Sequence, residues 1–90
     1  MNFEWDPKKA LSNERKHGIT FREAATVFGD PLAITFDDPD HSEGEYRYLT
    51  FGLSQFQRLL SISHTDSTDT VRIISAREAT KLERGIYEDD

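Results

Sequence analysis

Apolar residues follow two different spacings along the chain, and these spacings predict a mixture of strands and helices. Asn2–Trp5 is short, alternating and aromatic, which is typical of a strand. Asp6 and Pro7 are suited to the N-cap and the first helical position, and Gly18 is a common residue after a helix, so we expect a helix over Pro7–His17. Few of its residues are apolar, so much of this helix is expected to face water or a ligand.

A second helix has the clearest pattern. Thr20 and Glu23 have the spacing of a capping box, which predicts a helix that begins at Phe21 and stops at Gly29. Its apolar residues recur at helical spacing and are Phe21, Ala24, Ala25 and Phe28. The turn that follows leads into Leu32–Phe36, which we expect to be a second strand.

The middle of the chain contains three more runs that are typical of strands. They are Tyr46–Leu53, Arg58–Thr65 and Val71–Ser75. Short turns separate these runs, so we expect them to pair as a three-strand antiparallel meander. Together with the helices, this predicts an α+β fold in the order β-α-α-β-β-β-β-α, formed by one domain over residues 1–90.

A third capping-box spacing, between Ser75 and Glu78, predicts a last helix that begins at Ala76. Arg77 would then lie in the first helical turn, where a cation opposes the helix macrodipole at a cost of about 0.3–1 kcal/mol unless an anion is near. An anion-binding corner explains such a residue, and a solvated, charged helix face is the alternative. On this interpretation, replacing Arg77 by alanine leaves stability unchanged or improves it.

The charge distribution is uneven. The chain has a net charge of −6, which argues against a partner with a phosphate backbone. However, eight of the 17 acidic residues lie in Asp37–Glu45 or at residues 88–90, so the rest of the chain has more bases than acids. A local basic cleft is therefore compatible with the composition. The acidic loop Asp37–Glu45 lacks the spacing of known calcium or zinc sites, which favours a solvated loop over a metal site.

The composition also restricts the chemistry and the compartment. Cysteine is absent, so no disulfide or thiolate nucleophile is available, as is typical of a reducing cytoplasm. No apolar run approaches the ~20 residues that a membrane span needs, and no targeting segment is visible. We therefore expect a cytoplasmic protein without a membrane partner.

The residues that remain for chemistry are His, Arg and Lys side chains. Phosphate loops and the usual hydrolase motifs are missing. His64, Arg47 and Arg72 lie near strand ends, and antiparallel pairing can bring such ends to one sheet edge. A histidine with cations can cleave RNA without metal, because the ring transfers protons while the cations stabilise the phosphorane. The alternative is a structural His64, and His17 is interpreted as a helix cap.

Four segments together resemble the BrnT toxin family. They are F-E-W-D-P-K-K at 3–9, N-E-R-K-H-G-I-T-F-R-E-A at 13–24, G-E-Y-R at 44–47 and R-I-I-S-A-R-E-A-T-K-L-E-R at 72–84. The resemblance implies a RelE-like fold and a ribonuclease toxin that inhibits translation. It also implies neutralisation by a small ribbon-helix-helix antitoxin of the BrnA type.

By position, Lys9, Arg47 and Arg77 match polar positions of the family's motifs, and Glu83 and Arg84 match less closely. The resulting hypothesis has His64, Arg47 and Arg77 as catalytic residues, with His64 added from its chemistry alone. The substrate-binding candidates are Lys9, Arg72, Lys81 and Arg84. No metal or cofactor is expected. The expected partners are RNA, either free or on the ribosome, and the antitoxin. The toxin would contact DNA only through the antitoxin.

A different class of function remains open. The acidic balance favours a binding module that holds an antitoxin, or acts as a co-repressor, without catalysis. The set Arg47, His64, Arg72 and Arg77 favours the enzyme. Fold alone cannot distinguish the two.

Overall fold

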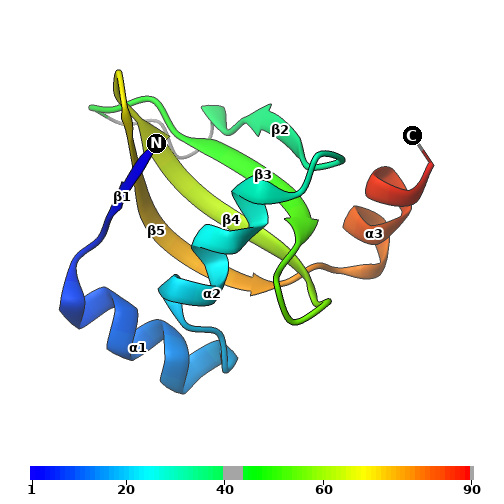
Figure 1. Ribbon diagram of the computed structural model, residues 1–90, viewed down its shortest axis with the longest axis horizontal. Coiled ribbons are helices and arrows are strands. Elements are labelled where there is room, and N and C mark those ends of the chain that lie inside the picture. Colours follow the sequence, from blue (N-terminus) through cyan, green and yellow to red (C-terminus); the bar gives the residue numbers. More distant parts are fainter. Residues whose placement is uncertain (40–43, 90) are drawn as a thin grey trace.

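The protein has an α+β fold built on one five-stranded sheet, as the computed structural model shows for residues 1–39 and 44–89 (Figure 1). The strands lie in the order β1-β5-β4-β3-β2. Along the chain the elements are β1 (Asn2–Glu4), α1 (Pro7–His17), α2 (Phe21–Thr26), the short 3-10 helix η1 (Val27–Gly29), β2 (Ile34–Asp37), β3 (Tyr48–Leu53), β4 (Leu59–Asp66), β5 (Thr70–Glu78) and α3 (Lys81–Glu88).

The antiparallel part of the sheet is larger than the three-strand meander that the pattern predicts. β2, β3, β4 and β5 pair antiparallel in that order, so β2 belongs to the same meander. β2 begins later than expected, because the N–H of Leu32 bonds to the carboxylate of Asp30 in a turn, at 2.9 Å. β1 pairs parallel with the start of β5 and closes the other edge. The N-terminus and the last strand are therefore neighbours.

The first two helices begin where their caps predict. The carboxylate of Asp6 accepts the N–H of Lys8 at 2.8 Å, and α1 ends at Gly18, which has a left-handed φ of 71°. The hydroxyl of Thr20 accepts the N–H of Glu23 at 3.0 Å, which confirms the start of α2. The return bond of a full capping box does not form there, because the Glu23 carboxylate binds Arg58 and Ser54 instead.

α1 and α2 pack on the same face of the sheet, and the core lies between them and β4 and β5 (Figure 1). The buried residues of this cluster are Ile19, Phe21, Ala24, Val27, Leu60, Ile62, Val71, Ile73 and Ala76. Phe3, Trp5, Ala10, Ala25 and Phe28 pack around it. Burial of these side chains is the main stabilising term for so small a chain.

Asn13 joins α1 to the edge of β5 through its side chain. Its amide accepts the N–H of Ala76 at 3.0 Å and donates to the carbonyl of Ala76 at 2.8 Å, as a neighbouring strand would. The same amide also donates to the carbonyl of Ile19 at 3.0 Å. An unpaired backbone group in the interior costs about 1–3 kcal/mol. The buried Asn13 side chain avoids this cost by making the two hydrogen bonds that a further strand beside Ala76 would make.

The predicted start of the last helix is wrong. Ser75 lies in the middle of β5, opposite Ser63, and α3 begins at Lys81. The full capping box is formed by Thr80 and Glu83, whose side chains each bond to the other's backbone. Both Ser75 and Thr80 have a glutamate three residues later, and pairing with β4 decides between them. Arg77 is therefore a strand residue, so the macrodipole argument and the expectation about its stability do not apply.

The described helices are all too short and too polar to cross a membrane.

Candidate functional site

The face of the sheet opposite the core carries Arg72 and Arg77, two of the six cations predicted to be functional. Ala76 is buried in the core, so Arg77 and Ser75, its neighbours along β5, point to the other side. Arg72 lies between the buried Val71 and Ile73 and points the same way. The residues opposite them on β4 are Thr65, Ser63 and Ser61. We call the set Ser63, Thr65, Arg72, Ser75 and Arg77 the open face.

A β-bulge brings these residues to one face. Arg77 lies five positions after Arg72. Because this offset is odd, a regular strand would place the two arginines on opposite faces. The register shifts between Ser63 and His64, where Ser63 pairs with Ser75 and His64 with Ile73, which leaves Ile74 as an extra residue. Such bulges re-aim side chains. Both arginines therefore flank the hydroxyls of Ser63, Thr65 and Ser75.

Arg77 is held by the last helix. Its guanidinium donates to both carboxylate oxygens of Glu83, at 2.7 and 2.8 Å, and more weakly to the carbonyl of Glu78. These hydrogen bonds raise the pKa of Arg77 and lower the pKa of Glu83. The remaining N–H groups of Arg77 have no partner among the described residues, and its side chain is 39% exposed. An anion can therefore still bind this arginine.

α3 lies against β3 and carries two more of the predicted cations (Figure 1). None of its residues is buried. Besides the Glu83 contact, Tyr87 anchors the helix by donating to the Asp30 carboxylate at 2.6 Å, which raises the pKa of Tyr87 to about 12. Lys81 is exposed at the first helical position, and Arg84 pairs with Glu88 at 3.5 Å. Both cations lie on the helix that holds Arg77.

Arg47 precedes β3 and continues the alternation of Leu49 and Phe51, whose partners on β4 are Ser63 and Ser61. This places Arg47 on the same side of the sheet as the open face. Its Nε lies 3.8 Å from the Glu45 carboxylate, and its side chain is partly exposed. Arg72 forms an exposed ion pair with Glu4 at 3.0 Å.

His64 does not lie on the open face with the arginines. Its ring is on the core side of β4 and only 1% exposed. The two ring nitrogens bond to Thr50 and Asp66, each at 2.7 Å, and Phe28 and Tyr48 pack against the ring. Burial lowers the pKa of His64, although the Asp66 carboxylate opposes this shift. Both ring nitrogens are therefore engaged by neighbouring side chains, and neither is directed at the open face.

A family model described as "Ribonuclease toxin, BrnT, of type II toxin-antitoxin system" matches residues 5–83. The chain belongs to the BrnT family. The crystal structure of the Brucella abortus ribonuclease toxin BrnT is similar, with a TM-score of 0.69 over 90% of this chain and 99% of that chain. The two are 20% identical, so this likeness supports the fold alone. A search of curated proteins finds no match.

Membership of the BrnT family makes this chain a ribonuclease toxin of a type II toxin-antitoxin system, with an antitoxin as its partner. The open face suits such a toxin because its arginines can bind phosphate and its hydroxyls can bind sugars or bases. No signal along the sequence pointed to Ser63, Thr65 and Ser75, because their common face depends on strand register. Within residues 1–39 and 44–89, no group of three or more His, Asp or Glu side chains could hold a metal ion. Residues 40–43 of the acidic loop lie outside this range.

Lys9 lies apart from the open face, on α1. It lines a groove between this helix and β5 that also includes Ser75. Ser75 therefore belongs both to the groove and to the open face.

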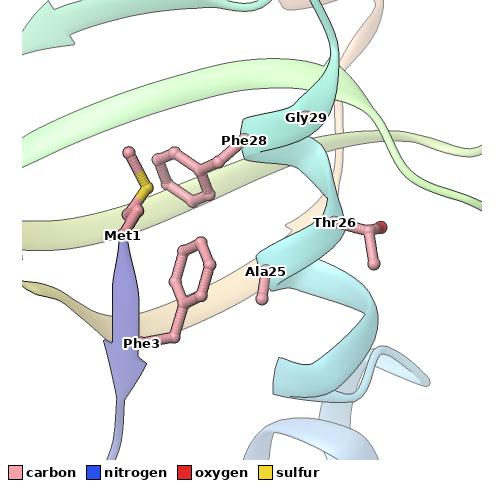
Figure 2. A pocket seen from close by; sticks show the side chains of 6 residues that line it. All are labelled: Met1, Phe3, Ala25, Thr26, Phe28 and Gly29. Carbon is pink, nitrogen blue, oxygen red and sulfur yellow. The ribbon is translucent and has the colours of Figure 1, made fainter.

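A larger pocket offers little chemistry. It has a volume of about 480 Å³ and is lined by Met1, Phe3, Ala25, Thr26, Phe28 and Gly29 (Figure 2). The hydroxyl of Thr26 is the one polar side-chain group in this lining, and it donates to the carbonyl of Glu23 at 2.6 Å. The side chains of this pocket therefore offer no cation to a phosphate.

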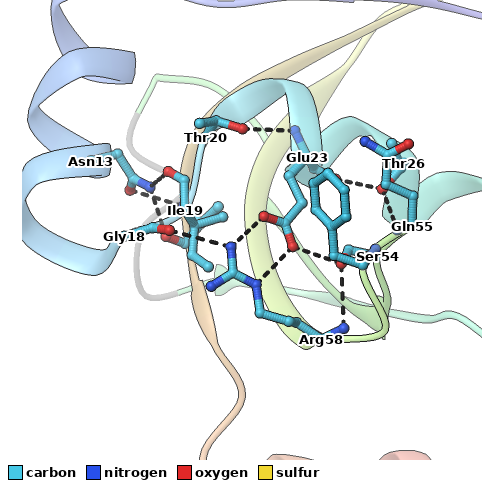
Figure 3. A network of polar contacts seen from close by, with 11 residues as sticks. Asn13, Gly18, Ile19, Thr20, Glu23, Thr26, Ser54, Gln55 and Arg58 are labelled. Carbon is cyan, nitrogen blue, oxygen red and sulfur yellow. Dashed lines mark hydrogen bonds and ion pairs between the residues drawn. The ribbon is translucent and has the colours of Figure 1, made fainter.

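A second arginine–glutamate pair is structural. Glu23 on α2 is 3% exposed, and its carboxylate binds Arg58 through both oxygens and the hydroxyl of Ser54 at 2.7 Å (Figure 3). Arg58 also donates to the carbonyl of Gly18. These bonds lower the pKa of Glu23 and raise the pKa of Arg58. The network connects α2 to the turn between β3 and β4, away from the open face.

Proposed function

We propose that this BrnT toxin is an endoribonuclease that cleaves RNA on its open face without a metal ion. The observation that supports this most directly is the bulge, which gathers Arg72, Arg77 and three hydroxyls on one partly exposed surface. We assign Arg77 and Arg47 to the reacting phosphate. Lys81, Arg84 and Arg72 contact the flanking RNA, because they lie on α3 or at the far end of the open face.

The chemistry follows from these charges. Water removes the 2′-OH proton as the 2′-oxygen attacks the adjacent phosphorus, the bond from phosphorus to the 5′-oxygen breaks, and the leaving 5′-oxygen takes a proton from water. Negative charge develops on the phosphorane oxygens between these steps. A fixed guanidinium lowers the energy of that state, and one such donor is worth about 3–4 kcal/mol in comparable sites. With His64 buried, we assign most of the rate to positioning and charge stabilisation.

The proposal extends to the biological setting. We infer that the fold is RelE-like, that cleavage inhibits translation, and that the antitoxin is a ribbon-helix-helix protein. The net charge of −6 favours a basic antitoxin and weakens binding to free RNA. The ribosome would compensate by supplying further contacts. DNA would then be reached only through the antitoxin.

The first experiment incubates the purified protein with RNA in the presence of EDTA and analyses the ends of the fragments. We expect cleavage with 2′,3′-cyclic phosphate ends, because the 2′-oxygen is the nucleophile. Cleavage that EDTA abolishes would reject metal independence. Intact RNA, both free and on ribosomes, would instead favour a non-catalytic antitoxin-binding or co-repressor module, for which the acidic balance argues.

The second experiment measures translation in a cell extract with and without the protein encoded beside the toxin gene. We expect the toxin to reduce protein synthesis, and the neighbour to restore it. The neighbour should also raise the melting temperature of the toxin, because a ligand of the folded state stabilises it by mass action. No restoration and no shift would reject this protein as the antitoxin.

A further inference from the structure

A cationic groove runs between α1 and β5, beside the open face. It has a volume of about 200 Å³ and is lined by Lys9, Ser12, Asn13, Lys16, His17, Ile74 and Ser75. The charged side chains of this lining are basic, and each lies on α1. Lys9, Lys16 and His17 form no ion pair with a carboxylate among the described residues. The groove is therefore free to bind an anion.

The charge of α1 contrasts with that of the whole protein. Within Pro7–His17 four Lys and Arg residues accompany a single acid, Glu14, so the helix has a charge of +3 in a chain of −6. Helix stability explains only part of this. Lys16 and His17 lie in the last turn, where cations are favourable, but Lys9 lies near the N-terminus, where the macrodipole opposes a cation. A ligand in the groove would account for Lys9.

The groove has a rigid wall. Asn13 fixes α1 to β5 through its two hydrogen bonds with Ala76, which adjoins Ser75. The cations on α1 are thereby held beside Ser75, and Ser75 lies on the open face opposite Ser63. The two surfaces meet at the edge of β5, so one RNA chain can occupy both.

We propose that this groove binds a phosphodiester of the RNA backbone, adjacent to the segment that lies on the open face. Lys9 and Lys16 neutralise the phosphate, and the side chains of Ser12 and His17 provide hydrogen bonds. This inference rests on the proposed function, because it assigns a subsite to the same RNA substrate. It adds Lys16 and His17 to the RNA contacts and places Lys9 with them rather than with Arg77.

The test compares two double variants that remove equal charge from the same helix. Lys9→Gln with Lys16→Gln changes the groove. Lys8→Gln with Arg15→Gln leaves its lining intact, because neither residue belongs to it. Binding to a single-stranded, fully 2′-O-methylated RNA, which cannot be cleaved, is measured over a series of salt concentrations. Melting temperatures check that both variants fold, and cleavage of ordinary RNA by the wild type is followed in parallel.

Removing the groove cations should flatten the dependence of log K on log salt by about 1.4, because each contact to a single strand contributes about 0.7. The control variant, Lys8→Gln with Arg15→Gln, should retain most of the wild-type dependence of log K on log salt. Equal slopes for the two double variants, or no binding by the wild type, would overturn the groove. Wild-type binding with the expected slopes but without cleavage would reject the nuclease and retain the groove. Cleavage by the wild type together with equal slopes for the two double variants would retain the nuclease and reject the groove.

Discussion

Two glutamate–arginine pairs, Glu23–Arg58 and Glu83–Arg77, are both bidentate but differ in how far the carboxylate is buried, with Glu23 3% and Glu83 13% exposed. In both pairs the carboxylate accepts two bonds from one guanidinium. Glu23 is enclosed between α2 and the turn after β3, and its carboxylate accepts a further hydrogen bond from the hydroxyl of Ser54. Glu83 lies on a helix without buried residues, and its arginine is on the open face.

The difference shows how one kind of contact serves two purposes. A buried carboxylate must keep its partner, since a charge without one is costly in the interior. A pair at the surface contributes little to stability, because water and salt screen it. Arg77 is thereby positioned on a surface without being essential to the core. The two faces of β4 differ in the same way. His64 is enclosed on the core side, whereas Ser63 and Thr65 lie on the open face.

The largest expected effect on stability is at the enclosed pair. Arg58→Ala leaves the Glu23 carboxylate buried without its cation, and we expect a loss of about 3–5 kcal/mol in the free energy of unfolding. Urea denaturation measures this loss. Arg72→Ala, which breaks an exposed pair with Glu4, is the matched control and should cost about 0–1 kcal/mol. Equal losses in the two variants would remove the distinction between the pairs.

Arg77→Ala should affect activity rather than folding. We expect the rate of RNA cleavage to fall about 30- to 1000-fold, which corresponds to about 2–4 kcal/mol of transition-state stabilisation. The free energy of unfolding should decrease by less than in Arg58→Ala, because the carboxylate left without its cation is 13% exposed at Glu83 and 3% exposed at Glu23. Single-turnover cleavage measures the change in rate, and urea denaturation measures the change in the free energy of unfolding.

The control for this variant is Arg22→Ala, which removes one exposed cation from α2. It should cleave RNA at close to the wild-type rate. If both variants were fully active, Arg77 would have no catalytic role. If Arg77→Ala lost as much stability as Arg58→Ala, the Glu83 pair would be structural as well.

A smaller effect separates the two candidate caps of the last helix. Thr80→Ala removes the hydroxyl that accepts the N–H of Glu83, so it should cost about 0.5–2 kcal/mol. Ser75→Ala removes no cap and should cost less. Thermal unfolding of both variants makes the comparison, and a larger loss at Ser75 would contradict the assignment of that residue to β5.

The smallest effect concerns pH and His64. Its pKa is lowered in the folded state by burial, so this residue adds stability above its ordinary pKa of about 6.5 and loses it as pH falls through the folded value. The Asp66 carboxylate opposes the shift, which limits the loss. Urea denaturation from pH 7 downward should show this decrease, and His64→Gln should remove it. An identical pH dependence in wild type and variant would show that His64 titrates normally.

Local sequence determined the first third of the fold. The start and end of α1 follow from Asp6, Pro7 and Gly18, and the start of α2 follows from Thr20, because caps act between residues a few positions apart. The family was also evident from segments of the sequence and is confirmed by the match over residues 5–83.

Tertiary structure alone decided the candidate site. Ser75 and Thr80 have equivalent local signals, and only the pairing of Ser75 with Ser63 makes one a strand residue and the other a cap. The bulge at Ile74 sets the face on which Arg72 lies, and the core around Phe28 and Tyr48 encloses His64. These outcomes depend on contacts between residues far apart in the chain. Spacing within one segment cannot encode which face of a strand its distant partners will cover.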